Sequence, residues 1–215
     1  MKMCSSGFAP RRRQGGFIQG AILFALVIIA VVVAAFSLAN RDSQSSADSE
    51  QARVNASFVL TVGNNLQTAV SRAIADGFQP ADLVANMKFL QSEATADGEL
   101  NLFDESLKYM IRPPFPLTAL QTTANQPFTA TTTEATWEDE AVAGVGVETE
   151  LEAIIVIGNI KEDVCRRINV TANRVVVTDP IIGTLAAAAT AGLREGCFGS
   201  GTAFSYFRVV ATDVS

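Results

Sequence analysis

RRRQGGFIQGAILFALVIIAVVVAAFSLAN, residues 11–40, is the stretch that decides how this chain is organised. From Gln14 to Asn40 it contains no charged residue, and its apolar centre runs from Ala21 to Ala39. About 20 apolar residues, each rising about 1.5 Å along a helix, are enough to cross a hydrocarbon layer roughly 30 Å thick. Because nothing in the run provides a polar face, residues 17–40 predict a transmembrane helix rather than a buried helix of a globular domain.

Charge is distributed unevenly along the 215 residues. Residues 1–16 carry four of the 16 basic residues and no acidic one, whereas the rest carries 12 basic and all 22 acidic residues, a net charge of −10. A basic flank before an apolar helix stays in the cytoplasm, so the part after the helix is predicted to be exported. An acidic exported part also argues against a nucleic-acid partner, because the phosphates would repel it.

Residues 1–16 have the character of a processing leader, which is set aside when the fold is considered. An ordinary secretory signal places small residues after a short apolar region. Here the candidate cleavage site, Gly15-Gly16-Phe17, precedes the apolar run. Cleavage after Gly16 would therefore leave the apolar helix on the mature protein.

Residues 41–76 predict an amphipathic continuation of the same helix. A serine-rich polar stretch comes first, and Gly77 is a plausible stop. Gly63 is a weak point inside the helix. Two helices separated by a serine hinge are the alternative. Apolar residues recur at steps of three and four, which places them on one face: Val54, Phe58, Val62, Leu66, Ala69, Val70 and Ala73.

Residues 77–215 predict an exported globular domain. Its clearest strands are Leu151–Ile157 and Ala203–Thr212, and a shorter candidate is Val175–Thr178. The predicted fold class is α+β, with a long N-terminal helix, transmembrane in its first half, packed on a small C-terminal antiparallel sheet. Short helices are expected at Pro80–Leu90, Lys161–Ala172 and Thr184–Leu193, and a turn at Ala94–Gly98. Glu138-Asp139-Glu140 predicts a solvated acidic loop, and a site for a divalent cation or a basic partner surface is the alternative.

Three cysteines are present, and two of them lie in the part predicted to be exported. Cys4 belongs to the leader, whereas an oxidising compartment would let Cys165 and Cys197 form a disulfide. Closing a loop of that size would restrict the unfolded chain by roughly 3–4 kcal/mol. Two unpaired buried thiols are the alternative.

The leader resembles the prepilin leader of type IV pilins and pseudopilins: basic residues, glycine, phenylalanine and then the apolar run. The resemblance implies a membrane-embedded prepilin peptidase that cuts after Gly16 and methylates Phe17. It also implies a long N-terminal helix on a C-terminal antiparallel sheet, and a disulfide near the C-terminus is common in the family. The residues that carry the resemblance are Arg11-Arg12-Arg13-Gln14-Gly15-Gly16-Phe17-Ile18.

The second half adds a weaker resemblance to pilin-like proteins of Gram-negative bacteria. Such proteins carry a strand, a cysteine-containing helix with an Ile-Asn pair, and a terminal segment that runs from a cysteine to a strand. The matching stretches are Gly144-Val145-Gly146, Glu150-Leu151, Asp163 to Asn169, and Cys197 to Val210.

One position departs from the family pattern. Most major pilins carry a glutamate at the fifth mature position, where this chain has Ala21. A carboxylate inside a membrane is costly unless it is paired, and in the family it is thought to pair with the N-terminal amine of a neighbouring subunit. Since Ala21 cannot do this, a minor or initiating subunit is favoured over a major pilin.

The resemblance implies a structural subunit of a type IV pilus or pseudopilus. Its partners would be other pilin or pseudopilin subunits, the prepilin peptidase and the inner membrane, with the C-terminal domain in the periplasm or in a surface filament. The alternative is a single-pass, membrane-anchored periplasmic binding protein or assembly-machine component that enters no filament.

An enzyme is not expected. The chain contains no histidine, which excludes histidine-based acid–base chemistry and histidine metal sites. HExxH, P-loop and Gly-x-Ser-x-Gly motifs are missing from the sequence, and Gly144-Val145-Gly146 lacks the context of a phosphate-binding loop. No catalytic residue, cofactor or metal ligand is therefore predicted.

Overall fold

The structure is a computed structural model, and it describes residues 47–89, 100–103, 109–128, 134–146 and 150–212. The chain divides into two units, residues 1–48 and 49–215, and the second unit is described below. The predicted leader, the predicted transmembrane helix, residues 41–46 and the predicted turn at Ala94–Gly98 lie outside the described residues. Within the ranges given above, no helix combines the length and the apolar character needed to cross a membrane.

A long helix covers residues 47–75 and ends where the sequence predicted. Gly77 adopts a positive φ of 105°, which a glycine reaches without steric cost. The amide of Phe78 donates to the carbonyl of Ala73 at 3.2 Å, the contact expected after a glycine stop. The buried face of this helix consists of Ala52, Asn55, Ala56, Val59, Val62, Gly63, Leu66, Ala69, Val70 and Ala73.

The predicted apolar stripe is wrong over the first two turns of this helix. Val54 is 62% exposed and Phe58 is 36% exposed, whereas Ala52 and Ala56 are buried. The predicted stripe advances by four residues from Val54 to Leu66, and each such step turns about 40° beyond a full turn of the helix, so its first members lie off the buried face. Asn55 takes a place on that face and accepts a hydrogen bond from Thr118 Oγ1 at 3.0 Å. Two apolar side chains therefore remain on the outer face.

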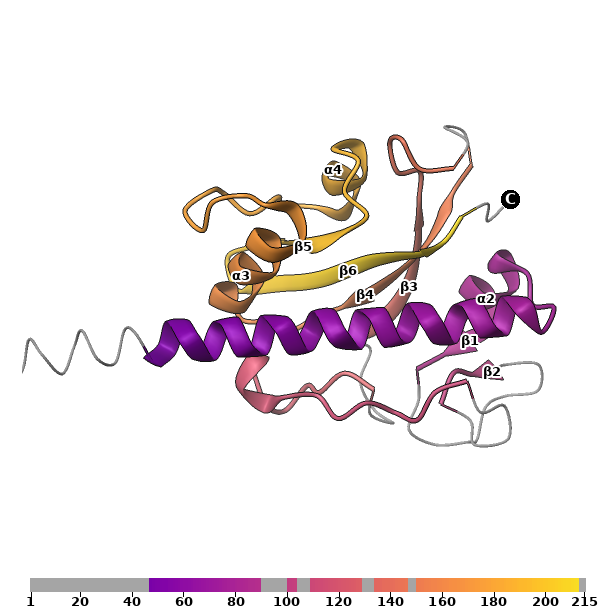
Figure 1. Cartoon of the computed structure of the whole chain (residues 1–215), viewed down its shortest axis with the longest axis horizontal. Helices are drawn as coiled ribbons and strands as arrows, with labels where there is room; N and C mark the ends of the chain where they lie inside the picture. The colour runs from indigo at the N-terminus through magenta and orange to yellow at the C-terminus, as the bar shows by residue number, and fades with distance from the viewer. Residues whose placement is uncertain (1–46, 90–99, 104–108, 129–133, 147–149, 213–215) are drawn as a thin grey trace, which may run out of the picture. The chain divides into compact units, whose positions relative to one another are not determined.

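A four-stranded antiparallel sheet lies behind the helix (Figure 1). Its order is β3-β4-β6-β5, so the C-terminal strand is central. The predicted strands at residues 151–157 and 203–212 are confirmed. The bounds are β3 (Ala135–Glu140), β4 (Glu152–Ile157), β5 (Glu195–Ser200) and β6 (Ala203–Ala211).

Both faces of the sheet are covered. Ile155, Ile157 and Tyr206 belong to the core that includes the long helix. Ile154 and Phe207 point the opposite way, into a second core that includes Ala188 and Ala189 of α4 (Leu185–Thr190). Because both faces are buried, β4 is buried at all six positions and shows no polar alternation. The α+β fold with a long helix on a small antiparallel sheet is thus confirmed.

Two of the short predicted helices are confirmed. α3 (Glu162–Asn173) buries Val164, Cys165 and Ile168, the face that the sequence predicted. α4 begins after Thr184, whose side-chain oxygen accepts a hydrogen bond from the amide of Ala187.

The predicted strand at Val175–Thr178 is wrong, because the segment is a loop. The amide of Val176 donates to Asp179 Oδ2 at 2.8 Å, and the amide of Asp179 donates to the carbonyl of Val176 at 2.9 Å. These turn contacts use backbone groups that a sheet ladder would need.

The segment between the long helix and the sheet is a short helix followed by two very short strands. α2 (Pro80–Asn86) starts at the proline, as predicted, but ends before Leu90. β1 (Met87–Lys88) then pairs in parallel with β2 (Leu100–Asn101), and η1 (Leu117–Ala119) follows. Aromatic side chains pack together beside β3: Phe89, Phe103, Phe115, Phe128 and Trp137.

Candidate functional site

The predicted residues fall into two groups. Gly16, Phe17 and Ala21 lie outside the described residues. Cys165 on α3 and Cys197 on β5 are buried, and their sulfur atoms lie 1.98 Å apart with a Cα–Cα distance of 5.3 Å. The structure therefore brings together the one cysteine pair that the sequence predicted, and the pair fastens α3 to the sheet edge.

Asn169 closes that edge of the sheet. Its Nδ2 donates to the carbonyl of Cys197 at 2.9 Å, and its Oδ1 accepts from the amide of Cys197 at 2.7 Å. These two bonds reproduce the pattern that a further strand would make with β5. Gly196 allows the approach, because a Cβ there would lie 3.0 Å from Asn169 Oδ1 and 2.8 Å from Asn173 Nδ2. The sequence had singled out an Ile-Asn pair here but had given it no role.

A polar cluster joins β5, β6 and the long helix. Tyr206 donates to Glu195 Oε1 at 2.6 Å, and Arg208 forms an ion pair with the same carboxylate. Arg208 also donates from Nη2 to Gln67 Oε1 at 2.7 Å, which ties the sheet to the helix. Burial, followed by the negative charge of Glu195, raises the pKa of Tyr206. Sequence reasoning missed this cluster, since Gln67 and Arg208 are 141 residues apart in the chain.

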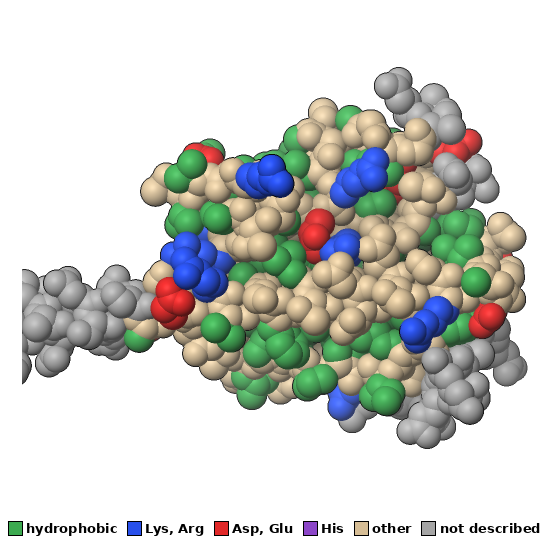
Figure 2. Space-filling view, viewed as in Figure 1, with side chains coloured by type: hydrophobic (Ala, Val, Ile, Leu, Met, Phe, Trp, Pro, Cys, Tyr) green, Lys and Arg blue, Asp and Glu red, His purple; other side chains and the backbone are tan. Residues whose placement is uncertain are grey.

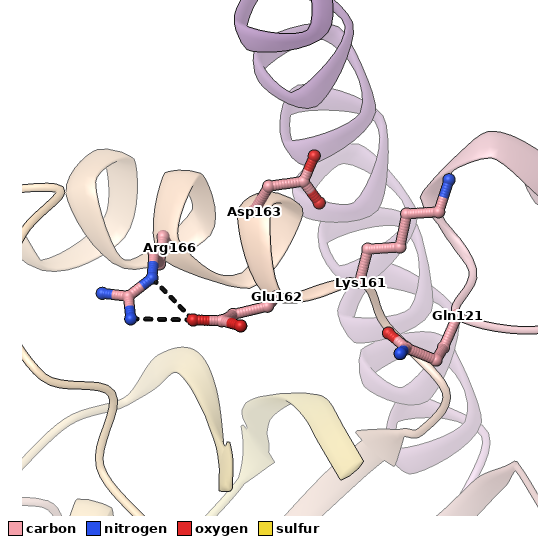
Figure 3. Close-up of a pocket in the computed structure, with 5 residues that line it drawn as sticks. All are labelled: Gln121, Lys161, Glu162, Asp163 and Arg166. Atoms are coloured by element: carbon pink, nitrogen blue, oxygen red, sulfur yellow. Dashed lines mark hydrogen bonds and ion pairs between the residues drawn. The ribbon is translucent and has the colours of Figure 1, made fainter. Parts of the chain in front are cut away.

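A shallow hollow of about 460 Å³ at the start of α3 contains several charged groups (Figure 3). Arg166 pairs with Glu162 at 2.8 Å, while Asp163 and Lys161 point away from that pair. Arg166 also donates to the carbonyls of Val177 at 3.2 Å and Asp179 at 2.9 Å. This guanidinium therefore holds the loop after α3. The residues that line the hollow are Gln121, Lys161, Glu162, Asp163 and Arg166.

The acidic run at residues 138–140 is not the solvated loop that the sequence predicted. It forms the second half of β3, and Glu140 lies directly opposite the buried Glu152 on β4. Glu152 Oε2 accepts the amide of Val142 at 2.7 Å and so fixes the turn after β3. Glutamate and aspartate are poor strand formers. The run nevertheless forms a strand, because β4 provides its backbone hydrogen-bond partners. Among the described residues, no three acidic or cysteine side chains are grouped to hold a metal ion.

Comparison of the chain with protein-family models, with curated proteins and with solved structures finds no match in any of the three. The function is therefore inferred from the residues and the geometry of this chain.

Proposed function

We propose that this protein is a structural subunit, minor or initiating, of a type IV pilus or pseudopilus-like filament. One observation carries the proposal: a long helix, preceded in the sequence by an uncharged apolar segment, lies along one face of a four-stranded antiparallel sheet. A filament subunit needs two such parts: an apolar segment that packs in an apolar environment, and a domain that remains folded in water. The sequence supplies the leader, and the folded domain supplies the water-facing part.

The contacts between the long helix and the rest of the domain fit such a role. Arg208 holds Gln67, Thr118 holds Asn55 and Arg167 holds Ser49 at 2.6 Å, so polar contacts fasten three points along the helix. These contacts fix the helix to the folded domain from Ser49 to Gln67. In the proposed filament, the domain would take its place when the apolar helices pack together.

Processing of the N-terminus tests the proposal. The full chain is expressed with an intact export pathway, and the mass and N-terminal sequence of the mature protein are determined. We expect Phe17, methylated, as the first residue. A Gly16→Ala variant with a basic, uncleaved leader is the matched control.

An intact Met1 on the native chain would overturn the filament proposal. It would leave a single-pass, membrane-anchored binding or assembly protein as the function.

A further inference from the structure

The outer edge of β3 is an open edge of the sheet. β3 pairs only with β4, because the order of the strands is β3-β4-β6-β5. The opposite edge, formed by β5, is closed by the side chain of Asn169. An unpaired edge presents a row of amide and carbonyl groups to which another strand can bond. β3 is therefore the strand at which the described sheet can be extended.

The register determines which backbone groups of β3 point outward. The amide of Gly158 donates to the carbonyl of Glu134 at 2.6 Å, directly before the first paired residues of β3 and β4. Hydrogen-bonded and non-hydrogen-bonded pairs alternate in an antiparallel ladder, so the even-numbered residues of β3 bond to β4. The odd-numbered residues direct their amides and carbonyls away from β4: Ala135, Trp137 and Asp139. None of these outward groups forms a backbone hydrogen bond with another residue that the structure describes.

The hairpin that contains β3 is strongly acidic. From residue 113 to residue 160 the sequence contains seven acidic residues and no basic one. β3 contributes three of them: Glu138, Asp139 and Glu140. The first two are exposed and the third is partly exposed, and none forms an ion pair with another described residue. The long helix differs, since Figure 2 shows an uncharged band where the sequence has no charged residue between Arg53 and Arg72.

A buried carboxyl group lies beside this edge. Glu152 on β4 is directly opposite Glu140, is fully buried, and its Oε1 has no hydrogen-bond partner among the described residues. Glu138 and Glu140 project from the same face of the sheet as Glu152, because side chains two residues apart in a strand share a face. A cation beside Glu140 on an added strand would lie about 10 Å from β4, two strand spacings away, and would offset part of this negative charge.

We propose that the β3 edge binds an extended segment of a different protein, which adds as an antiparallel strand and carries lysine or arginine at alternate positions. The acidic side chains select a basic segment by charge complementarity. A second copy of this chain does not supply such a segment, because no two basic residues after residue 16 stand two positions apart. Two copies also cannot pair through their β3 edges without placing like charges opposite each other.

The pairing geometry assigns a role to each position of the bound segment. Residues opposite Glu138 and Glu140 would form non-hydrogen-bonded pairs, in which the Cα atoms lie about 4.5 Å apart and the side chains are closest. Basic side chains belong at these positions, and their own amides point away from β3. The intervening residues, opposite Trp137 and Asp139, supply the amides and carbonyls that bond to β3.

Binding of synthetic peptides to the full chain in a neutral detergent tests the proposal. The probe is a short labelled peptide in which lysine and valine alternate, and fluorescence anisotropy measures its affinity. A peptide of the same composition with its lysines in one block is the control. We expect the alternating peptide to bind roughly tenfold more tightly, because only its lysines can face Glu138 and Glu140 while its valines bond to β3. Equal affinities would overturn the proposal, since they would leave only unspecific charge attraction.

Methylation of the peptide amides tests the hydrogen bonds separately from the charge. Methyl groups on the valine amides should abolish binding, because these amides face β3. Methyl groups on the lysine amides should change the affinity by no more than about twofold, because these amides face away. Equal effects of the two modifications would exclude an added strand.

Charge reversal locates the site on the protein. Glu138→Lys combined with Glu140→Lys should weaken binding of the lysine peptide roughly tenfold and should bind a peptide in which glutamate and valine alternate. Binding of the second peptide also shows that the variant is folded, and its absence would count against the proposal. Asp48→Lys combined with Glu50→Lys, the same charge change at exposed positions of the long helix, is the matched control and should leave binding unchanged. Equal losses in the two variants would overturn the proposal. None of these measurements depends on cleavage after Gly16, so this proposal and the filament proposal fail separately.

Discussion

Gly63 on the long helix faces Tyr206 on β6, and the missing side chain of the first makes room for the hydroxyl of the second. A Cβ at Gly63 would overlap the hydroxyl and ring of Tyr206. Glycine inside a helix costs about 1 kcal/mol relative to alanine, so the position needs a reason. The reason is the close approach of helix and sheet, which lets Tyr206 remain fully buried while it donates to Glu195 at 2.6 Å.

We expect Gly63→Ala to destabilise the domain, although alanine is the better helix former. The added methyl group forces the helix away from β6 or Tyr206 away from Glu195, and overpacking of this kind costs about 1–3 kcal/mol. Urea denaturation of the purified protein measures the loss. Gly183→Ala is the matched control, since a Cβ there meets nothing within 4 Å. Equal stability of Gly63→Ala and the native chain would show that the helix does not pack as closely as described.

Tyr206→Phe should change how stability depends on pH. Burial and the neighbouring Glu195 raise the pKa of Tyr206 above its ordinary value of 10.0 in the folded state. Below about pH 10 the hydroxyl is protonated in both the folded and the unfolded states, so no pH dependence arises from it. Above about pH 10 the unfolded state releases the proton while the folded state keeps it, so the native chain loses stability as the pH rises.

Tyr206→Phe removes this contribution, and its free energy of unfolding should therefore fall less between about pH 8 and about pH 11. Urea denaturation at the two pH values checks the prediction. Part of the slope should remain, because burial and Asp76 also raise the pKa of Tyr109, the other tyrosine of the chain. Identical slopes for the variant and the native chain would contradict a buried Tyr206.

Asn169→Ala should destabilise the domain, because Asn169 bonds to the backbone of β5 at the edge of the sheet. The substitution leaves both the amide and the carbonyl of Cys197 without their partner, and each buried unsatisfied group costs about 1–3 kcal/mol. Asn169→Asp should also destabilise, since a carboxylate cannot donate to the carbonyl. The midpoint of urea denaturation measures both effects. Thr171→Ala on the same helix is the control, because Thr171 is exposed and bonds only within α3. If the control is as destabilising as Asn169→Ala, the loss of the two bonds to Cys197 does not explain the effect.

Thiol counting tests the pairing of Cys165 with Cys197. The protein, expressed under oxidising conditions and denatured without reductant, should react with no thiol reagent at these two positions and should yield two thiols there after reduction. Breaking the bond, which spans 32 residues, should lower the free energy of unfolding by about 3–4 kcal/mol, because the unfolded chain gains freedom. The double variant Cys165→Ser with Cys197→Ser measures that loss. Two reactive thiols in the unreduced protein would refute the bond.

Local patterns allowed the sequence to predict the regular elements. Residues 151–157 and 203–212 are dense in β-branched and aromatic side chains, and α3 shows its buried face at a helical period. β5 escaped prediction because it contains Gly196 and Gly199, which disfavour strands in isolation. β6 supplies the hydrogen bonds of β5, and this pairing in the folded domain outweighs the low strand propensity of the two glycines.

The candidate sites divide in the same way. The apolar run, the basic segment before it with its Gly16-Phe17 junction, and the two cysteines in the part predicted to be exported are properties of neighbouring residues or of a count, so they could be read from the sequence alone. Three other points depend on residues far apart in the chain: which side chains near the start of the long helix are buried, why Gly63 occupies its position, and how Glu195 contacts both Tyr206 and Arg208. The tertiary structure alone decided these points, because the packing of two elements fixes their relative rotation, and no local pattern in either one encodes it.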